Sequence, residues 1–238
     1  MKVLITGATS GIGLSLVERY SRSNYDVIAC GRSEEKLSRL KTQFPKISTL
    51  VFDITDNIQI NKAISAIENL DVAILNAGDC EYIDDVMAFD ADLFARVVTV
   101  NLISMGYLVS ALIPKLNQQG TLALMSSSVT NLPFPRAQAY GASKAGVDYL
   151  AKTLELELTP KGIHVALIHP GFIKTPLTDK NDFDMPFLMT SDEAAERIFD
   201  GIGRGKSLIQ FPKRFMYLMK FIAILPKSWW ARMVLKGS

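Results

Sequence analysis

Short apolar runs and longer amphipathic segments alternate along most of the 238-residue chain. The apolar runs predict strands at residues 3–6, 26–30, 49–52, 72–75, 121–127, 164–168 and 207–211. Apolar side chains recur at helical spacing over residues 14–20, 33–44, 56–67, 92–116, 139–158 and 190–201. Apolar strands that alternate with helices are typical of a parallel sheet covered on both faces. The pattern therefore predicts an α/β fold, Rossmann-like and doubly wound, with a seven-stranded, mostly parallel sheet and helices on both faces.

Capping and breaking residues support several of these boundaries. Asp56 is an expected N-cap, and Thr190 with Glu193 matches a capping box at the start of the last of these helices. Gly120 is expected to break the chain before the fifth strand.

We expect one domain over residues 1–238, because the length suits a single α/β domain and no composition break or repeat divides it. The two cysteines, Cys30 and Cys80, lie far apart, so we expect neither a disulfide framework nor a metal site. A strand pattern begins at once and leaves no room for a signal peptide, which favours a cytoplasmic protein. The longest apolar run, residues 215–225, is too short to span a bilayer.

A glycine-rich turn, TGATSGIG at residues 6–13, connects the first strand to the first helix. Glycines let a backbone approach a pyrophosphate closely, and the helix N-terminus directs amide groups at that charge. A tight turn without a ligand is the alternative, but the position after the first strand of a βα series favours a dinucleotide. The residues expected to contact the cofactor here are Gly7, Thr9, Ser10, Gly11, Ile12 and Gly13.

The end of the second strand favours NADP(H) over NAD(H). An acidic side chain there would bind the ribose hydroxyls of NAD, whereas this chain has Gly31 and Arg32. Arg32 could pair with a 2′-phosphate, and Ser10 could donate one more hydrogen bond. The alternative for Arg32 is a solvated surface arginine.

The turns after the third and fourth strands are further candidates for cofactor contacts. Asp53, followed by Ile54, could hold the adenine edge, or Asp53 could cap the next helix. Asn76, Ala77 and Gly78 could run along the cofactor ribose or merely leave the strand.

Seven short motifs follow one another in one order: TGATSGIG from residue 6, DIT from 53, NAG from 76, VNL from 100, SSS from 126, YGASK from 140 and PGFIKT from 170. In this order the chain resembles the short-chain dehydrogenase/reductase family from residue 2 to about 176. The TGxxxGxG spacing and the length resemble its compact oxidoreductase branch. The resemblance implies a nicotinamide cofactor and a homodimer or homotetramer.

The resemblance also implies a catalytic set of Asn101, Ser127, Tyr140 and Lys144. In the family the serine stands seven residues after the glycine that opens the fifth strand and thirteen before the tyrosine. Both counts select Ser127 from three consecutive serines. Tyr140 and Lys144, one helical turn apart, are expected to contact the cofactor as well.

These four residues predict proton transfer beside a hydride transfer. A tyrosine with an ordinary pKa near 10 is a poor base at neutral pH. The ammonium of Lys144, together with an oxidised nicotinamide ring, is expected to lower the pKa of Tyr140 by about 1–3 units. Tyr140 could then give a proton to a carbonyl oxygen or take it from an alcohol. By resemblance, Ser127 would orient that oxygen, and Asn101 would position a water beside Lys144.

The strand exit after residue 169 resembles the segment that meets the nicotinamide carboxamide, although an ordinary strand exit is the alternative. The residues expected to make this contact are Pro170, Gly171, Ile173 and Thr175. His164 and His169 match no catalytic position, and we interpret both as structural.

Two segments are candidates for the substrate side. Residues 176–190 carry polar residues followed by FDMPFLM, which predicts an adaptable apolar lid over an apolar carbonyl compound, with residues 132–134 as another wall. Packing of these side chains against the core or a partner subunit is an equally serious alternative.

The segment 212–238 is basic and apolar. No acidic residue follows Asp200, although eight basic residues do. A helix docked over the pocket or a dimer interface is the interpretation we favour, with peripheral attachment to an anionic membrane as the alternative. The net charge of +2 gives nucleic-acid binding no support.

The sequence therefore predicts an NADP(H)-dependent oxidoreductase for a small carbonyl or secondary alcohol substrate. A protein that binds NADP(H) and senses redox state without turnover is the first alternative, and the intact proton relay argues against it. A Rossmann methyltransferase is the second, and Arg32 in place of an acid, together with YGASK, counts against it.

Overall fold

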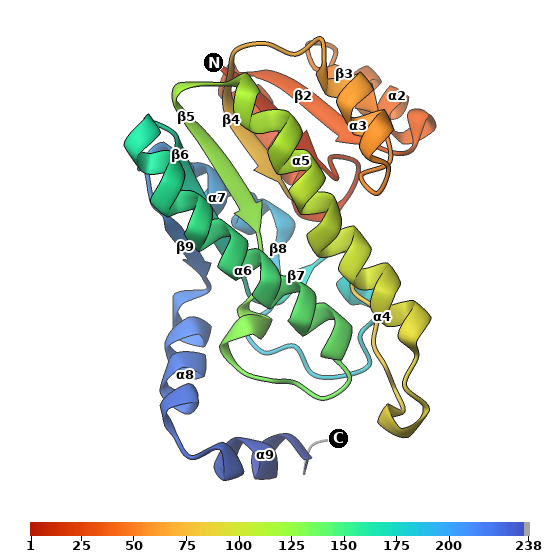
Figure 1. Cartoon of the computed structure of the whole chain (residues 1–238), viewed down its shortest axis with the longest axis vertical. Coiled ribbons are helices and arrows are strands. Elements are labelled where there is room, and N and C mark those ends of the chain that lie inside the picture. Colours follow the sequence, from red (N-terminus) through yellow and green to blue (C-terminus); the bar gives the residue numbers. More distant parts are fainter. Residues whose placement is uncertain (236–238) are drawn as a thin grey trace.

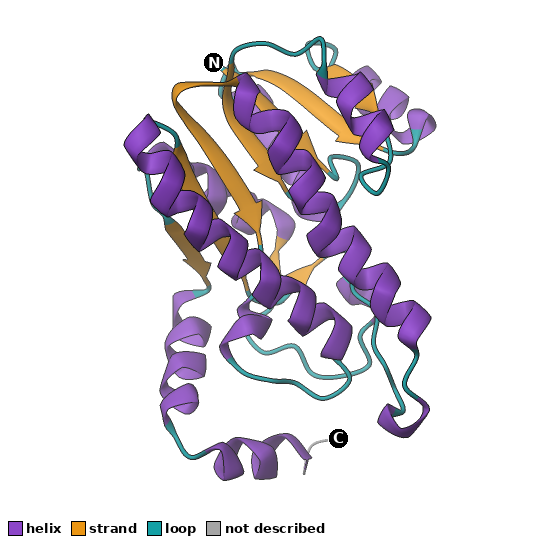
Figure 2. Cartoon of the chain, in the orientation of Figure 1, coloured by secondary structure: helices purple, strands orange, loops and turns teal. Residues whose placement is uncertain are grey.

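The computed structural model describes residues 1–235, so the last three residues of the predicted basic segment lie outside the described part. A seven-stranded sheet runs through its centre (Figures 1 and 2). The strands are β1 (Lys2–Thr6), β2 (Asp26–Gly31), β3 (Ser48–Val51), β4 (Leu70–Leu75), β5 (Leu116–Met125), β6 (His164–Pro170) and β9 (Leu208–Phe211). Their order is β3-β2-β1-β4-β5-β6-β9, and each strand runs parallel to its neighbours. The predicted doubly wound, Rossmann-like fold is confirmed.

Helices cover both faces of this sheet because successive strand residues point to opposite sides. Val3 and Ile5 face one apolar cluster, and Leu4 faces the other. The helices of the first cluster are α1 (Gly11–Arg22), α2 (Glu34–Gln43) and α7 (Ser191–Gly203). The helices of the second are α3 (Asn57–Ile64), α5 (Ser104–Leu112) and α6 (Gln138–Leu158). In Figure 1, α5 and α6 lie in front of the sheet and α7 behind it.

The predicted helical stretch over residues 92–116 is confirmed as a continuous helix, Ala91–Lys115, but its middle is not a regular α-helix. It begins as α4 (Ala91–Val98), widens into a π-helical turn (Thr99–Ile103), continues as α5 and ends in a 3₁₀ turn (Ile113–Lys115). Wide turns of this kind are rare in proteins as a whole, and those that occur are often found at functional sites. This one carries Asn101, whose exposed fraction is 0%.

The same stretch, Ala91–Lys115, is the one helix of the described chain that is long and apolar enough to cross a membrane. In its most apolar 18-residue window, 44% of the residues are buried inside the protein. Its middle part, α5, packs against α3 and joins the second apolar cluster. Packing inside the fold therefore accounts for part of this apolar composition.

The predicted break at Gly120 is also wrong, because β5 passes through it. Leu116 pairs with Leu70 and Thr121 pairs with Val72, with a register shift between the two pairs. Residues 117–120 therefore form a bulge rather than a loop.

Capping follows the sequence. The side chain of Asp56 accepts hydrogen bonds from the first amide groups of α3. Thr190 and Glu193 form the predicted capping box at the start of α7. Both predictions are confirmed.

Two further features lie at the carboxyl ends of the strands, which point toward the lower half of Figure 1. Strands β7 (Ile173–Lys174) and β8 (Met189–Thr190) form an additional parallel pair of two residues each, which the sequence did not predict. Helices α8 (Lys213–Ile224) and α9 (Lys227–Leu235) continue from β9 and extend beyond the body of the molecule.

Candidate active site

The glycine turn between β1 and α1 is a cradle that side chains would fill. Gly7 and Gly11 have φ values of +65° and +51°, where glycine is strongly favoured. A Cβ on Gly13 would lie 2.1 Å from the carbonyl oxygen of Gly7. The N-cap residue Ser10 makes no side-chain capping bond, so the first amide groups of α1 remain available to an anion. This backbone fits a pyrophosphate.

The NAG turn after β4 is attached to the glycine turn. The amide groups of Asn76 and Ala77 donate to the Thr6 hydroxyl over 3.0 and 3.1 Å, and the Asn76 side chain donates to the Thr6 carbonyl oxygen over 3.0 Å. A Cβ on Gly78 would lie 3.4 Å from Nζ of Lys144. The turn therefore connects the expected cofactor cradle to the expected catalytic residues.

The strand exit after β6 reaches the same cradle from the other side. Gly171 donates its amide hydrogen to the carbonyl oxygen of Phe211 over 2.7 Å. Ile173 is buried in β7. A Cβ on Gly11 would lie 2.9 Å from the methyl group of Thr175, so the glycine turn and this segment are in close contact.

Other expected cofactor residues lie around the end of β2 and β3. Arg32 is exposed and forms no ion pair with any residue in the described range. A Cβ on Gly31 would lie 3.3 Å from the methyl group of Thr9, which places the end of β2 against the glycine turn. Ile12 and Ile54 pack partly against the two apolar clusters.

Asp53 forms a turn of its own rather than a helix cap. One carboxylate oxygen accepts hydrogen bonds from the amide group and the hydroxyl of Thr55, both over 2.8 Å. Asp56 caps α3 instead. An adenine contact by Asp53 stays a prediction.

Ser127, Tyr140 and Lys144 meet where β5 ends beside α6. Oγ of Ser127 accepts a hydrogen bond from the amide group of Val129 over 3.2 Å at the start of a 3₁₀ turn (Ser128–Asn131), and Ser127 lines the same cavity as Tyr140. Nζ of Lys144 donates to the carbonyl oxygen of Met125 over 2.9 Å and lies 5.8 Å from the centre of the Tyr140 ring. The structure thus brings the predicted serine, tyrosine and lysine together.

The pKa values of this group depart from expectation. Burial raises the pKa of Tyr140 well above its ordinary value, and the nearby Ser127 side chain opposes this only in part. Burial also lowers the pKa of Lys144 to about 8. Among the protein residues alone, desolvation is the largest effect on the pKa of Tyr140, and the lowering by Lys144 together with an oxidised nicotinamide stays a prediction. Tyr140 is therefore a protonated phenol at neutral pH.

The side chain of Asn101 is held by hydrogen bonds from both its oxygen and its nitrogen. Its side-chain oxygen accepts from the amide group of Asp79 over 2.8 Å, and its Nδ2 donates to the Asp79 carbonyl oxygen and to the Ser143 hydroxyl over 2.8 and 3.0 Å. These bonds hold the loop after the NAG turn against α6. A water-positioning role stays a prediction.

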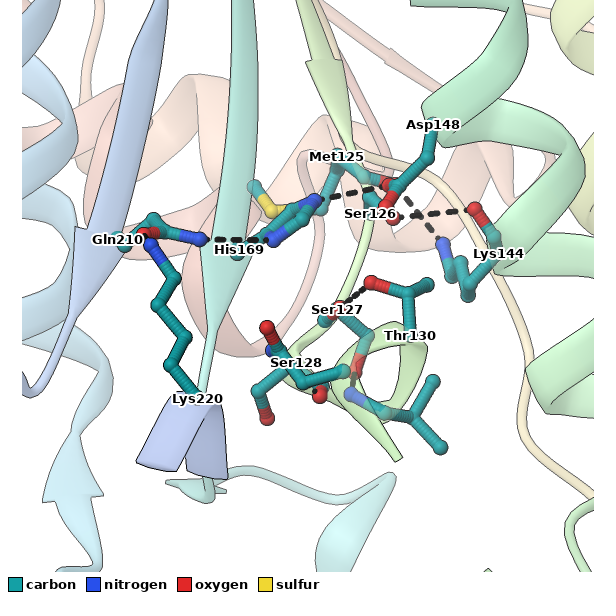
Figure 3. Close-up of polar contacts among 12 residues, drawn as sticks. Met125, Ser126, Ser127, Ser128, Thr130, Lys144, Asp148, His169, Gln210 and Lys220 are labelled. Atoms are coloured by element: carbon teal, nitrogen blue, oxygen red, sulfur yellow. Dashed lines mark hydrogen bonds and ion pairs between the residues drawn. The ribbon is translucent and has the colours of Figure 1, made fainter. Parts of the chain in front are cut away.

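Sequence reasoning missed a buried carboxylate, Asp148, one helical turn after Lys144 (Figure 3). It lies 2.8 Å from Nε2 of His169 and accepts a hydrogen bond from Ser126. Burial would raise the pKa of Asp148, but the bonds from His169 and Ser126 outweigh it and hold this pKa below its usual value. Its charge raises the pKa of Lys144, against the effect of burial. An acidic residue four positions after the lysine on a predicted helix was the available signal.

His169 extends this network toward the surface. Its Nδ1 lies 3.2 Å from the amide nitrogen of Gln210, whose oxygen accepts a hydrogen bond from Lys220 of α8 over 2.7 Å (Figure 3). His164, at the start of β6, differs, because its buried Nε2 has no hydrogen-bond partner among the described residues.

A cavity of about 450 Å³ opens in front of Tyr140 and Ser127. Its apolar lining includes Val129, Phe134, Phe172, Leu177, Phe183, Phe215 and Val234. From the predicted lid segment, Leu177 and Phe183 reach this cavity, whereas Met189 is buried in the first apolar cluster. The cavity walls also include one residue of α8 and one of α9.

The lid segment is fastened to the cavity rim by polar contacts. Arg136 forms ion pairs with Asp84 and Asp182 over 2.7 and 2.8 Å. The hydroxyl of Tyr82 donates to Asn181 over 3.0 Å. Arg136 thus connects the rim to the segment that covers the cavity.

Comparisons with known proteins give a consistent result. A model of the short chain dehydrogenase family matches residues 1–185. A 3-oxoacyl-[acyl-carrier-protein] reductase of Rickettsia prowazekii is 34% identical over 180 residues, which cover 74% of this chain and 74% of the relative. A short-chain dehydrogenase from Sphingobium yanoikuyae, solved with NADPH, is 26% identical with a TM-score of 0.79, covering 94% of this chain and 96% of that one. A family member from Burkholderia phymatum, solved with NAD, has a TM-score of 0.82 at 19% identity over 92% of this chain and 91% of that one, which shows the fold alone.

Proposed function

Because the chain belongs to the short-chain dehydrogenase/reductase family of NAD(P)-dependent oxidoreductases, we propose that it reduces apolar carbonyl compounds, or oxidises the corresponding alcohols, with NADP(H). The predicted family and enzyme class are confirmed by the family match. The observation that carries the finer proposal is that Tyr140 and Ser127 line one cavity, while Nζ of Lys144 lies 3.4 Å from where a Cβ on Gly78 would stand, beside the turn that follows β4.

The residues present fit a nicotinamide dinucleotide. The glycine turn and the first amide groups of α1 would hold the pyrophosphate, and the NAG turn and Lys144 would hold the ribose beside the nicotinamide. The bound cofactor supplies or accepts the hydride at its nicotinamide ring.

The chain's own residues handle the oxygen and its proton. A substrate oxygen seated between Ser127 and Tyr140 would accept a hydrogen bond from each hydroxyl. Tyr140 is protonated at neutral pH, as a residue that donates a proton to the substrate oxygen has to be. The apolar lining excludes water from the reacting carbon.

Turnover on a panel of aldehydes and ketones with NADPH tests this function. Consumption of NADPH that depends on the carbonyl compound is the expected result. Cofactor binding without turnover on any member of the panel would instead favour the sensor alternative.

Arg32 is expected to set the cofactor preference. In the wild type, kcat/KM should be roughly 10- to 100-fold higher with NADPH than with NADH, the effect of one charge-assisted arginine–phosphate contact. The change Arg32→Asp should reverse the preference, because a carboxylate there accepts hydrogen bonds from the ribose and repels the phosphate.

The matched control for this measurement is Arg39→Asp, which removes another exposed arginine, on α2, that pairs with Glu35. It should leave the NADPH-to-NADH ratio unchanged. Equal use of both cofactors by the wild type would contradict the assignment.

Arg136 is expected to affect substrate affinity more than chemistry. Replacing it by alanine removes the ion pairs that fasten the lid segment to the rim, so KM should rise by up to about fivefold with kcat nearly unchanged. Steady-state kinetics on any accepted ketone measure this, with Arg96→Ala as control because its pair with Glu81 does not include the lid segment. A fall in kcat at constant KM would refute this role.

We also propose a homodimer or homotetramer in the cytoplasm. Exposed apolar side chains support the assembly: Tyr149 and Leu156 stand two helical turns apart on α6 and are 74% and 77% exposed. Family members often form such oligomers.

A further inference from the structure

Helix α8 is apolar on two opposite sides. The residues that face the protein are buried: Phe215, Met216, Met219 and Ile222. The residues of the outer stripe are Tyr217, Leu218, Phe221 and Ile224, which are 70%, 43%, 63% and 83% exposed. No part of the described chain covers this outer stripe. A helix with apolar side chains on opposite sides is normally covered on both, by the rest of a protein or by a membrane.

Helix α9 adds further exposed apolar side chains and further positive charge to those of α8. Trp229 and Met233 on α9 are 58% and 57% exposed. The exposed basic residues of the two helices are Lys213, Arg214, Lys220, Lys227 and Arg232. No acidic residue follows Asp200 in the sequence. These basic residues and the outer stripe, with Trp229 and Met233, are called the tail patch below.

The positive charge of the tail patch indicates which kind of partner covers it. A second copy of this chain, bound about a twofold axis, would set lysines and arginines of one copy against those of the other. An anionic lipid surface offers negative charge to the basic side chains and an apolar layer to the aromatic ones. Tyrosine and tryptophan side chains, with one apolar and one polar end, suit the boundary between the two.

The inner side of the same helices belongs to the substrate cavity. Phe215 of α8 and Val234 of α9 line that cavity. The indole of Trp230 donates a hydrogen bond to the carbonyl oxygen of Pro133 over 2.6 Å, next to Phe134 in the cavity wall. One pair of helices thus forms both the cavity wall and the tail patch.

We propose that the tail patch docks this protein on an anionic membrane surface, and that the substrate is an amphiphilic carbonyl compound or alcohol that enters the cavity from that surface. The substrate half rests on the proposed function, but the docking half does not require turnover.

Flotation with vesicles tests the docking half. The full-length protein should float with vesicles of phosphatidylcholine and phosphatidylglycerol, and not with phosphatidylcholine alone, and high salt should release it. The double change Phe221→Ser and Ile224→Ser should reduce vesicle binding by at least about tenfold, because two exposed apolar side chains lose their burial in lipid. Ile58→Ser on α3, which is 81% exposed, should bind like the wild type.

Two kinetic measurements separate the docking half of the proposal from the substrate half. On a short water-soluble ketone, the double variant should match the wild type. On a long-chain ketone carried in the anionic vesicles, it should be at least about tenfold slower. Equal rates on the vesicle-borne ketone would overturn the substrate half.

Other outcomes are equally decisive. Absence of flotation with anionic vesicles would overturn docking. A concentration-dependent dimer that the double variant abolishes would assign the tail patch to a second copy and also overturn it. Flotation of a wild type that shows no turnover would refute the proposed function and leave docking standing.

Discussion

Tyr140→Phe is expected to reduce turnover by about 10²- to 10⁴-fold, the usual contribution of a positioned general acid or base. The change removes one oxygen from a ring that stays in place, so the fold and cofactor binding should be retained. Without that hydroxyl, Ser127 alone faces the substrate oxygen and no side chain in the cavity delivers the proton along the proposed path. Single-turnover kinetics with NADPH, together with cofactor titration, measure both effects.

The control is Tyr149→Phe, which removes the hydroxyl of a 74% exposed tyrosine on the same helix. Its turnover should equal that of the wild type. Retention of more than about a tenth of the activity by Tyr140→Phe would exclude Tyr140 as the main proton donor.

Lys144→Met should change activity and stability in opposite directions. The residue Lys144 is only 3% exposed, and burial lowers the pKa of its ammonium group from 10.5 to about 8, a penalty of about 3 kcal/mol to the folded state at neutral pH. Methionine removes this penalty but leaves the Met125 carbonyl oxygen without its donor, which costs about 1–3 kcal/mol. We expect a net gain of about 1 kcal/mol at pH 7, with turnover reduced by at least about 10²-fold.

The stability difference should depend on pH in a defined direction. Between about pH 8 and 10.5 the unfolded wild type binds more protons at Lys144 than the folded one, so wild-type stability rises through this window. The variant has no such contribution. Its advantage in the free energy of unfolding should therefore be largest below pH 8, shrink above it and reverse near pH 9. Urea unfolding at several pH values measures this, and a constant difference would contradict it.

Local patterns in the sequence were sufficient for most of the fold. The continuous apolar strands required a sheet buried on both faces, and the glycine turn after β1 located the cradle without knowledge of strand order. Asp56 and the Thr190–Glu193 pair fixed helix starts because capping depends on neighbours within three residues. The spacing of Tyr140 and Lys144 indicated a shared helix face for the same reason.

The features that sequence missed depend on contacts between distant segments. The apolar spacing of residues 92–116 predicts an uninterrupted α-helix and gives no sign of the π-helical turn at Asn101. In the structure the side chain of Asn101 is hydrogen-bonded to Asp79 and Ser143, which belong to other segments of the chain. The hydrogen bond between Asp148 and His169 joins α6 to the end of β6. The pKa of Tyr140 also escaped prediction, because the extent of its burial is set by side chains from several loops.

The short ladder of β7 and β8 has a consequence for how this protein can diversify. Residues 173–174 and 189–190 are paired, so both ends of the intervening stretch are anchored side by side at the edge of the cavity. A segment tethered in this way can lengthen, shorten or exchange side chains at little cost to the central sheet, because closing a longer loop costs only slowly increasing entropy. New substrate preferences can therefore arise in that stretch while the cofactor cradle keeps its shape.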